Sequence, residues 1–252
     1  MTNLTSVILG LLFLGLVAPA EFAEEEQKSF TVDELVAKNI QAKGGAAALN
    51  SIQSLRFTGK LIVNEGKLKL AVLETKKRPG KVRSEISLQG MTQVQSYDGK
   101  DGWRISPFQG RKDPEKMSTD DLKSLSEDAE IGGPLVDWKT KGSTVAYLGT
   151  EDVDGTLAHK LKVTRKNGDV SFVYLDPDYF LEIRILTQRI EHGAQIEEEE
   201  DLGDYEKVNG VFFPFSKETG SKGDPDKAKY NIEKAEANVP VDDALFRFPV
   251  SK

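Results

Sequence analysis

Side chains that commonly carry out covalent catalysis are scarce in this sequence. Cysteine is absent, which removes thiol nucleophiles, disulfides and zinc–thiolate sites, and there are only two histidines, His159 and His192. His159 alternates with Leu157 and Leu161, so the three side chains share one face of a predicted strand, and this predicts a half-buried structural role for His159. His192 precedes Gly193 in a predicted turn. No G-x-S-x-G sequence marks a nucleophilic serine. We therefore expect no catalytic residue and no enzyme activity.

Two acidic segments resemble cation sites only superficially. Residues 197–201 are consecutive carboxylates, but alternate side chains of a strand point to opposite faces and cannot converge on one ion. We expect this segment to form a solvated edge or loop. Residues 98–102 resemble the start of a calcium loop, yet the twelfth position is Gln109 rather than glutamate. Phosphate-binding glycine motifs are also missing, so we expect no metal and no cofactor.

Composition excludes another class of partner. The 252 residues carry 34 Lys and Arg against 41 Asp and Glu, and the resulting net charge of −7 does not favour nucleic acid. Hydrophobic residues make up 38% of the chain, which is enough for a sizeable core.

An apolar leader precedes the globular part. Residues 7–17 form an apolar run that is too short to span a bilayer, and Ala18-Pro19-Ala20 follows as a small-residue cleavage signal. We predict a signal peptide over residues 1–20, cleaved after Ala20, and a mobile acidic tail over residues 21–29. No Lys or Arg precedes the run, so an uncleaved anchor is the alternative.

Residues 30–252 are expected to form one α+β domain. Thr31 and Glu34 make a capping box that starts a helix, and Gly44-Gly45 ends it. From Leu55 the apolar period changes from 3.6 to 2, with turn signals between short segments, which predicts an antiparallel sheet of about ten or eleven strands. One helical segment, capped by Ser118, interrupts these strands, and added strands follow residue 144.

The predicted sheet has more apolar surface than its helices can cover. Two or three short helices, each about 10–12 Å wide, cover only part of one face. A curved sheet with helices across its mouth would leave an apolar cavity. The alternative is an interior filled by side chains, in a structural or interaction domain.

Three motifs, in order, resemble the periplasmic lipoprotein-localisation family (LolA/LolB-like, and more distantly the RseB sensor domain). They are Lys-Arg-Pro at residues 77–79, Asp-Gly-Lys-x-x-Trp within residues 97–103, and Asp-Asp-Ala-Leu-Phe-Arg-Phe-Pro at residues 242–249, which is similar to the family's closing Asp-x-x-x-Phe-x-Phe-x-Pro. Residues 42–45, 89–91 and 210–215 also resemble exported outer-membrane lipoprotein-sorting-like proteins. The absence of cysteine argues against the lipid-anchored branch.

The resemblance implies an open, curved antiparallel half-barrel closed by two or three helices, with an apolar interior that carries acyl chains across the periplasm. It assigns Arg78 to holding a helical lid through the lid carbonyls, which suits the five donors of a guanidinium. Strand parity gives candidate cavity residues: Phe57, Leu61, Leu70, Val72, Ile86, Leu161, Val163, Leu181 and Ile183. Candidate lid residues besides Arg78 are Leu122, Leu125, Leu135 and Trp138.

We therefore predict a periplasmic, monomeric carrier of lipid or lipoprotein acyl chains, with an inner- or outer-membrane transport partner. The alternatives are a periplasmic sensor or protein-interaction module with the same fold, and an uncharacterised hydrolase.

Overall fold

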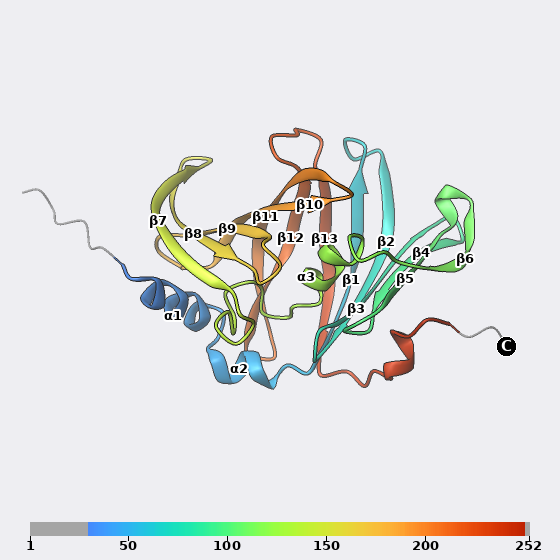
Figure 1. The fold of residues 1–252 in the computed structure, drawn as a ribbon, viewed down its shortest axis with the longest axis horizontal. Helices are drawn as coiled ribbons and strands as arrows, with labels where there is room; N and C mark the ends of the chain where they lie inside the picture. Colours follow the sequence, from blue (N-terminus) through green and yellow to red (C-terminus); the bar gives the residue numbers. More distant parts are fainter. Residues whose placement is uncertain (1–29, 250–252) are drawn as a thin grey trace, which may run out of the picture.

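The computed structural model describes residues 30–249. Three α-helices, α1 (Val32–Ala42), α2 (Ala46–Ser51) and α3 (Leu122–Asp128), accompany one large sheet (Figure 1). The predicted signal peptide and acidic tail lie outside the described residues. The strands are β1 (Ser54–Val63), β2 (Leu68–Lys77), β3 (Lys81–Leu88), β4 (Met91–Tyr97), β5 (Gly102–Ser106), β6 (Arg111–Lys116), β7 (Thr144–Val153), β8 (Thr156–Thr164), β9 (Val170–Leu175), β10 (Glu182–Glu191), β11 (Ala194–Val208), β12 (Val211–Ser221) and β13 (Ala228–Ala237). Short 3₁₀ turns cover Pro107–Gln109 and Asp243–Leu245.

Every strand pairing is antiparallel, and the strand order is β6-β5-β4-β3-β2-β1-β13-β12-β11-β10-β9-β8-β7. This confirms a mostly antiparallel curved sheet with three helices, although its thirteen strands exceed the expected ten or eleven. The sheet is open, because β6 and β7 pair on one side only. These two edge strands are consecutive in the chain, so the segment between them must cross the sheet.

That connecting segment, residues 117–143, is here called the roof segment. It contains α3 and lies over the face of the sheet that we call the inner face (Figure 1). At one end, Leu125 and Ala129 pack against Val82 of β3. At the other end, Leu135 packs in a cluster with Leu35 of α1. The roof segment is therefore anchored on both halves of the sheet.

The predicted capping box of α1 is present. The Thr31 hydroxyl accepts from the Glu34 amide at 3.2 Å, and the Glu34 carboxylate accepts from the Thr31 amide at 2.8 Å. The buried Leu35 and Val36 of α1 then pack on Leu161 and Val163 of β8. Because these strand residues form the inner face near the β7 edge, α1 covers that end of the sheet.

The opposite, outer face is covered in part by the chain end. Residues 239–249, here called the C-terminal strap, lie along β2 to β5. The Trp103 indole and the Ser96 hydroxyl donate to the Phe246 carbonyl at 2.9 and 3.2 Å, and Phe246 is fully buried. Lys77 and Lys81 each form an ion pair with Asp243 at 2.7 Å.

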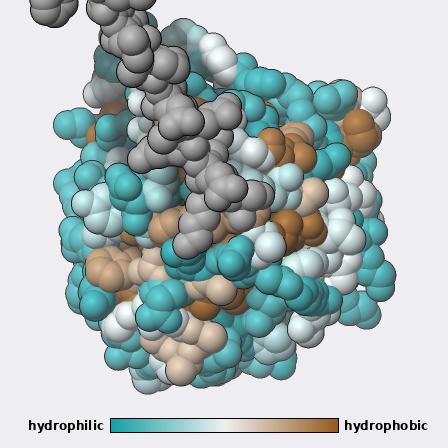
Figure 2. All heavy atoms as spheres, turned by 90° about the vertical axis from the view of Figure 1, so that its left-hand side faces the viewer, coloured by the Kyte–Doolittle hydropathy of each residue, from teal (hydrophilic) through white to brown (hydrophobic). Residues whose placement is uncertain are grey.

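Figure 2 faces the side of the molecule that carries β7 and α1, and its hydrophilic surface is interrupted by hydrophobic patches. Leu148 of β7 and Leu157 of β8 are half exposed. Within residues 30–249, no helix has the length and apolar character needed to cross a membrane.

Candidate functional site

A cavity of about 320 Å³ lies between the roof segment and the inner face of the sheet. Residues 127 and 128 of α3 and residues 130–134 form its upper wall, and β1, β2 and β9 to β12 contribute its floor. The volume is at the lower end of the roughly 300–1,000 Å³ typical of small-molecule pockets. A cavity beneath the helices is one of the two outcomes that the sequence left open, the other being an interior filled by side chains.

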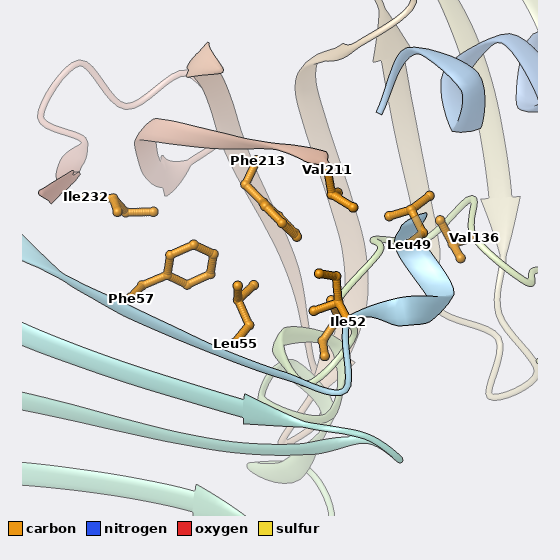
Figure 3. Close-up of a cluster of buried hydrophobic side chains, with 9 residues drawn as sticks. Leu49, Ile52, Leu55, Phe57, Val136, Val211, Phe213 and Ile232 are labelled. Atoms are coloured by element: carbon orange, nitrogen blue, oxygen red, sulfur yellow. The ribbon is translucent and has the colours of Figure 1, made fainter. Parts of the chain in front are cut away.

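One wall of the cavity is apolar. Leu55 and Phe57 of β1, Phe213 of β12 and Ile131 of the roof segment line it. The rings of Phe57 and Phe213 meet edge to face with centroids 5.9 Å apart, and both belong to the cluster drawn in Figure 3. These side chains offer an acyl chain or another apolar group a surface that excludes water.

The other wall is charged, which corrects the expectation of an apolar interior. Lys76 of β2 forms an ion pair with Glu74 at 3.2 Å, and Lys217 of β12 forms one with Glu200 of β11 at 3.4 Å. Lys76 and Lys217 both line the cavity, as do Glu198 and Glu200. The predicted solvated edge at residues 197–201 is therefore wrong, because β11 is an interior strand of the sheet.

Two carboxylates of α3 project into this charged half. Burial raises the pKa of Glu127 to about 7, and the protein packed around Asp128 raises its pKa to about 6 although the Asp128 side chain is exposed. Glu127 lies 3.4 Å from the Arg165 guanidinium, but Glu127 Oε1 has no hydrogen-bond partner in the described chain. Across residues 30–249, the Asp128 carboxylate makes neither a hydrogen bond nor an ion pair.

A buried ion pair fixes one end of the cavity. Lys43, just after α1, lies 2.5 Å from Glu182 of β10 and donates to the Gly132 carbonyl at 3.0 Å. Tyr205 of β11 donates to the Glu182 carbonyl at 2.8 Å, and burial raises the pKa of Tyr205 well above its usual value. These contacts join α1, the roof segment, β10 and β11 beside the cavity.

The predicted cavity residues fall into four groups. Phe57 lines the cavity, whereas Leu61, Leu70, Val72 and Ile86 share its inner face by register but lie beyond its lining.

Leu161 and Val163 are fully buried beneath α1, and Leu181 is half-buried just before β10. Ile183 packs instead with Leu186 and Tyr174 in a different cluster. The register shift between Glu182 and Arg184 explains this difference, because a bulge reverses the alternation on which parity depends.

The predicted lid residues lie at the two anchored ends of the roof segment. Leu122 sits above Gly102 of β5, where an added Cβ would be 2.3 Å from Leu122 Cδ2, and Leu125 packs on β3. Leu135 and Trp138 pack with α1. Arg78 donates to the carbonyls of Ile52 at 2.9 Å and Leu49 at 3.3 Å, at the end of α2, and these bonds do not reach the roof segment.

Neither histidine lines the cavity. The His159 ring accepts or donates a 2.9 Å hydrogen bond with the Tyr147 hydroxyl and stacks on Phe180, and burial lowers the pKa of His159. His192 is exposed and lies 3.2 Å from Asp121. No group of three or more metal-ligating side chains is found in residues 30–249.

The three sequence motifs meet away from the cavity. Lys77 of the first motif pairs with Asp243 of the third, and Trp103 of the second donates to Phe246 of the third. None of residues 77–79, 97–103 or 242–249 lines the cavity. Apart from the α2 contacts of Arg78, these motifs hold the C-terminal strap on the outer face. Their contacts therefore stabilise the fold and do not form part of the cavity.

No family model and no curated protein matches the sequence. Solved crystal structures do match the fold. A LolA superfamily protein from Nitrosomonas europaea is 10% identical, with a TM-score of 0.58 over 87% of this chain and 98% of that chain. A DUF1329 family protein from Desulfovibrio piger is 15% identical, with a TM-score of 0.58 and the same coverage. A candidate outer membrane lipoprotein-sorting protein domain from Vibrio parahaemolyticus is 12% identical, with a TM-score of 0.55 over 84% of this chain and 97% of that chain.

Proposed function

We propose that this chain, which has the LolA-like fold, is an exported carrier that holds an acyl chain or a comparable apolar group in the cavity beneath the roof segment. The observation that carries this proposal is the cavity of about 320 Å³ with Phe57, Phe213 and Ile131 on one wall. Each buried CH₂ group contributes about 0.8 kcal/mol before the ordering costs of binding are subtracted.

The size of the cavity limits the cargo in the state described. A volume at the lower end of the small-molecule range suits a single chain or part of one. A lipoprotein with several acyl chains would require the roof segment to move. We propose that such movement, or handover to a membrane partner, also permits release, because dissociation of a buried chain into water is slow.

The predicted signal peptide indicates where the protein would act. A signal peptide cleaved after Ala20 would deliver the mature chain to the periplasm, where proteins of the resembled family act. The mass of the exported protein, measured after expression in a Gram-negative host, tests the cleavage site directly.

Native mass spectrometry of freshly purified protein tests the carrier function. We expect a lipid-sized mass to co-purify and to be lost in organic solvent. We also expect the neutral fluorophore N-phenyl-1-naphthylamine to bind the emptied protein.

A variant that fills the cavity provides the matched test. Ile131→Trp should weaken binding of the fluorophore at least tenfold, because the indole occupies the space beside Phe57. Leu148→Trp, a similar change at a half-exposed position of β7, should leave binding unchanged. Equal binding by the wild type and Ile131→Trp, or no bound lipid and no fluorophore binding, would contradict the proposal.

A further inference from the structure

The charged wall of the cavity is unusual for a site that receives only an acyl chain. An ion in contact with a hydrocarbon loses hydration without gaining a partner, so an apolar ligand alone is poorly matched to this wall. Of the titratable side chains that line the cavity, six are carboxylates and four are cationic. The lining therefore has a net negative charge when all of these groups are ionised.

The cations of this wall already have carboxylate neighbours. Lys76 and Lys217 lie beside Glu74 and Glu200, and Lys43 is held by Glu182. Arg165 makes its shortest contact, 2.7 Å, with Glu130 rather than with Glu127. An anionic head group would have to compete with these carboxylates for the same ammonium and guanidinium groups.

Two roof carboxylates have few partners within residues 30–249: Glu127 has only the 3.4 Å ion pair with Arg165, and Asp128 has none. Asp128 forms no hydrogen bond or ion pair within residues 30–249, although its side chain keeps accessible surface on the cavity. One oxygen of Glu127 is buried without a hydrogen bond in the same part of the chain. Loss of hydration raises the pKa of both groups and outweighs the opposing effect of the neighbouring cations, Arg165 at Glu127 and Lys76 at Asp128.

We propose that the cavity selects amphiphiles whose head group is an ammonium cation over amphiphiles with an anionic head group. This inference rests on the proposed carrier function. The tail lies against Phe57, Phe213 and Ile131, and the ammonium donates to Asp128 and Glu127. A protonated amine has the donors that these two carboxylates lack, and the partly buried setting screens their attraction less than bulk water does.

Three ligands with one chain length separate head-group charge from chain burial. Decylamine, decanol and decanoate are titrated below their aggregation concentrations, at pH 8, by displacement of N-phenyl-1-naphthylamine. We expect decylamine, as its ammonium form, to bind at least tenfold more tightly than decanoate, with decanol in between. A tenfold difference corresponds to about 1.4 kcal/mol.

Isosteric variants then locate the effect. Asp128→Asn and Glu127→Gln should each weaken decylamine binding severalfold, and together at least tenfold, while decanol binding stays within twofold of wild type. Glu127→Gln changes a half-buried side chain and Asp128→Asn an exposed one, so both variants should fold. Glu233→Gln removes the same charge from an exposed position of β13 and should change none of the three affinities.

The pH dependence supplies a second measurement. Between pH 8 and pH 5 the amine stays protonated, while the two carboxylates take up protons, so decylamine should bind more weakly at pH 5 and decanol should not change. The charged groups that face the two carboxylates are Lys76, Glu74, Lys217, Glu200 and Arg189 from the sheet, and Arg165 and Asp169 from the turn between β8 and β9.

The outcomes distinguish this inference from the carrier function. If decylamine, decanol and decanoate bind within threefold of one another, or if the roof variants change decylamine and decanol binding equally, the head-group selectivity is wrong and the carrier function stands. If decanol and the fluorophore fail to bind as well, the carrier function is overturned and the selectivity with it.

Discussion

Lys43 and Glu182 form an ion pair with almost no access to water, since their side chains are 8% and 2% exposed. Removing two charges from water is costly, and such a pair gives little net stability compared with apolar residues of the same size. Its value here is geometric, because Lys43 also donates to the Gly132 carbonyl of the roof segment. The pair fixes where the roof segment meets α1 and β10.

Breaking this pair from one side should be strongly destabilising. Lys43→Met leaves the Glu182 carboxylate buried without its cation, and we expect a loss of about 3–5 kcal/mol in the free energy of unfolding, measured in urea. The double variant Lys43→Met/Glu182→Leu should recover most of that loss. Lys60→Met, which breaks the exposed pair with Glu233, should cost less than about 1 kcal/mol. A similar small loss for Lys43→Met would refute the assigned role.

At the scale of elements, the junction between α1 and α2 depends on one close approach. Gly44 has φ +118°, and a Cβ there would lie 2.2 Å from the Gly210 carbonyl oxygen in the turn between β11 and β12. The neighbouring Gly45 has φ +90° but has only the Gln41 side chain, at 3.7 Å from an added Cβ, nearby. The two glycines therefore share a left-handed backbone and differ in steric contact.

This pair of glycines allows a matched comparison. Gly45→Ala should cost roughly 1–2 kcal/mol of unfolding free energy, because an alanine in the left-handed region is strained. Gly44→Ala should cost about 1–3 kcal/mol more, because the turn at Gly210 must also move. Thermal and urea unfolding of both variants measures the difference. Equal losses of unfolding free energy would contradict the prediction, because they would show that the contact between residue 44 and the Gly210 carbonyl does not destabilise the variant.

The elements that the sequence predicts well are those with local or repeated signals. The capping box at Thr31 and Glu34 places the start of α1, and alternation places the interior strands. The edge strand β6 is missed, because its sequence is charged and contains Pro114, as edge strands often are. The face of the sheet on which Ile183 lies is predicted wrongly, because the sequence carries no signal for the β-bulge between Glu182 and Arg184.

The candidate site is predicted only in part, for a related reason. Parity identifies Phe57, and the helical segment after Ser118 indicates where a cavity lies. The same parity places Glu74 and Lys76 on the face that carries Leu70 and Val72, which was the available signal for a charged wall. Which strands are interior depends on the pairing of β1 with β13, and no local pattern reveals that long-range contact.

At the scale of the whole molecule, the cavity makes stability depend on pH. The pKa of Glu127 is about 7 in the folded chain, against an ordinary value of 4.5. Between these values the folded state binds more protons than the unfolded state, so the free energy of unfolding falls as pH rises from about 4.5 to 7. Asp128 acts in the same direction, since its pKa is also raised.

Glu127→Gln should remove much of this dependence. At pH 8 the variant should be more stable than wild type by roughly 1–3 kcal/mol, and near pH 4 the two should be equal. Urea unfolding between pH 4 and pH 8 measures the effect, with Glu233→Gln as the exposed control. A difference that does not vary with pH would contradict the burial of an ionised Glu127.

The order of the strands has a mechanical consequence. The sheet's two outermost strands, β6 and β7, are joined by residues 117–143, which also bound the cavity. Flattening the sheet separates those strands and draws their connection taut, whereas tighter curling slackens it. The width of the sheet and the volume of the cavity are therefore expected to change together. A protein that binds at β6 or β7 would then change the cavity volume without contacting the ligand.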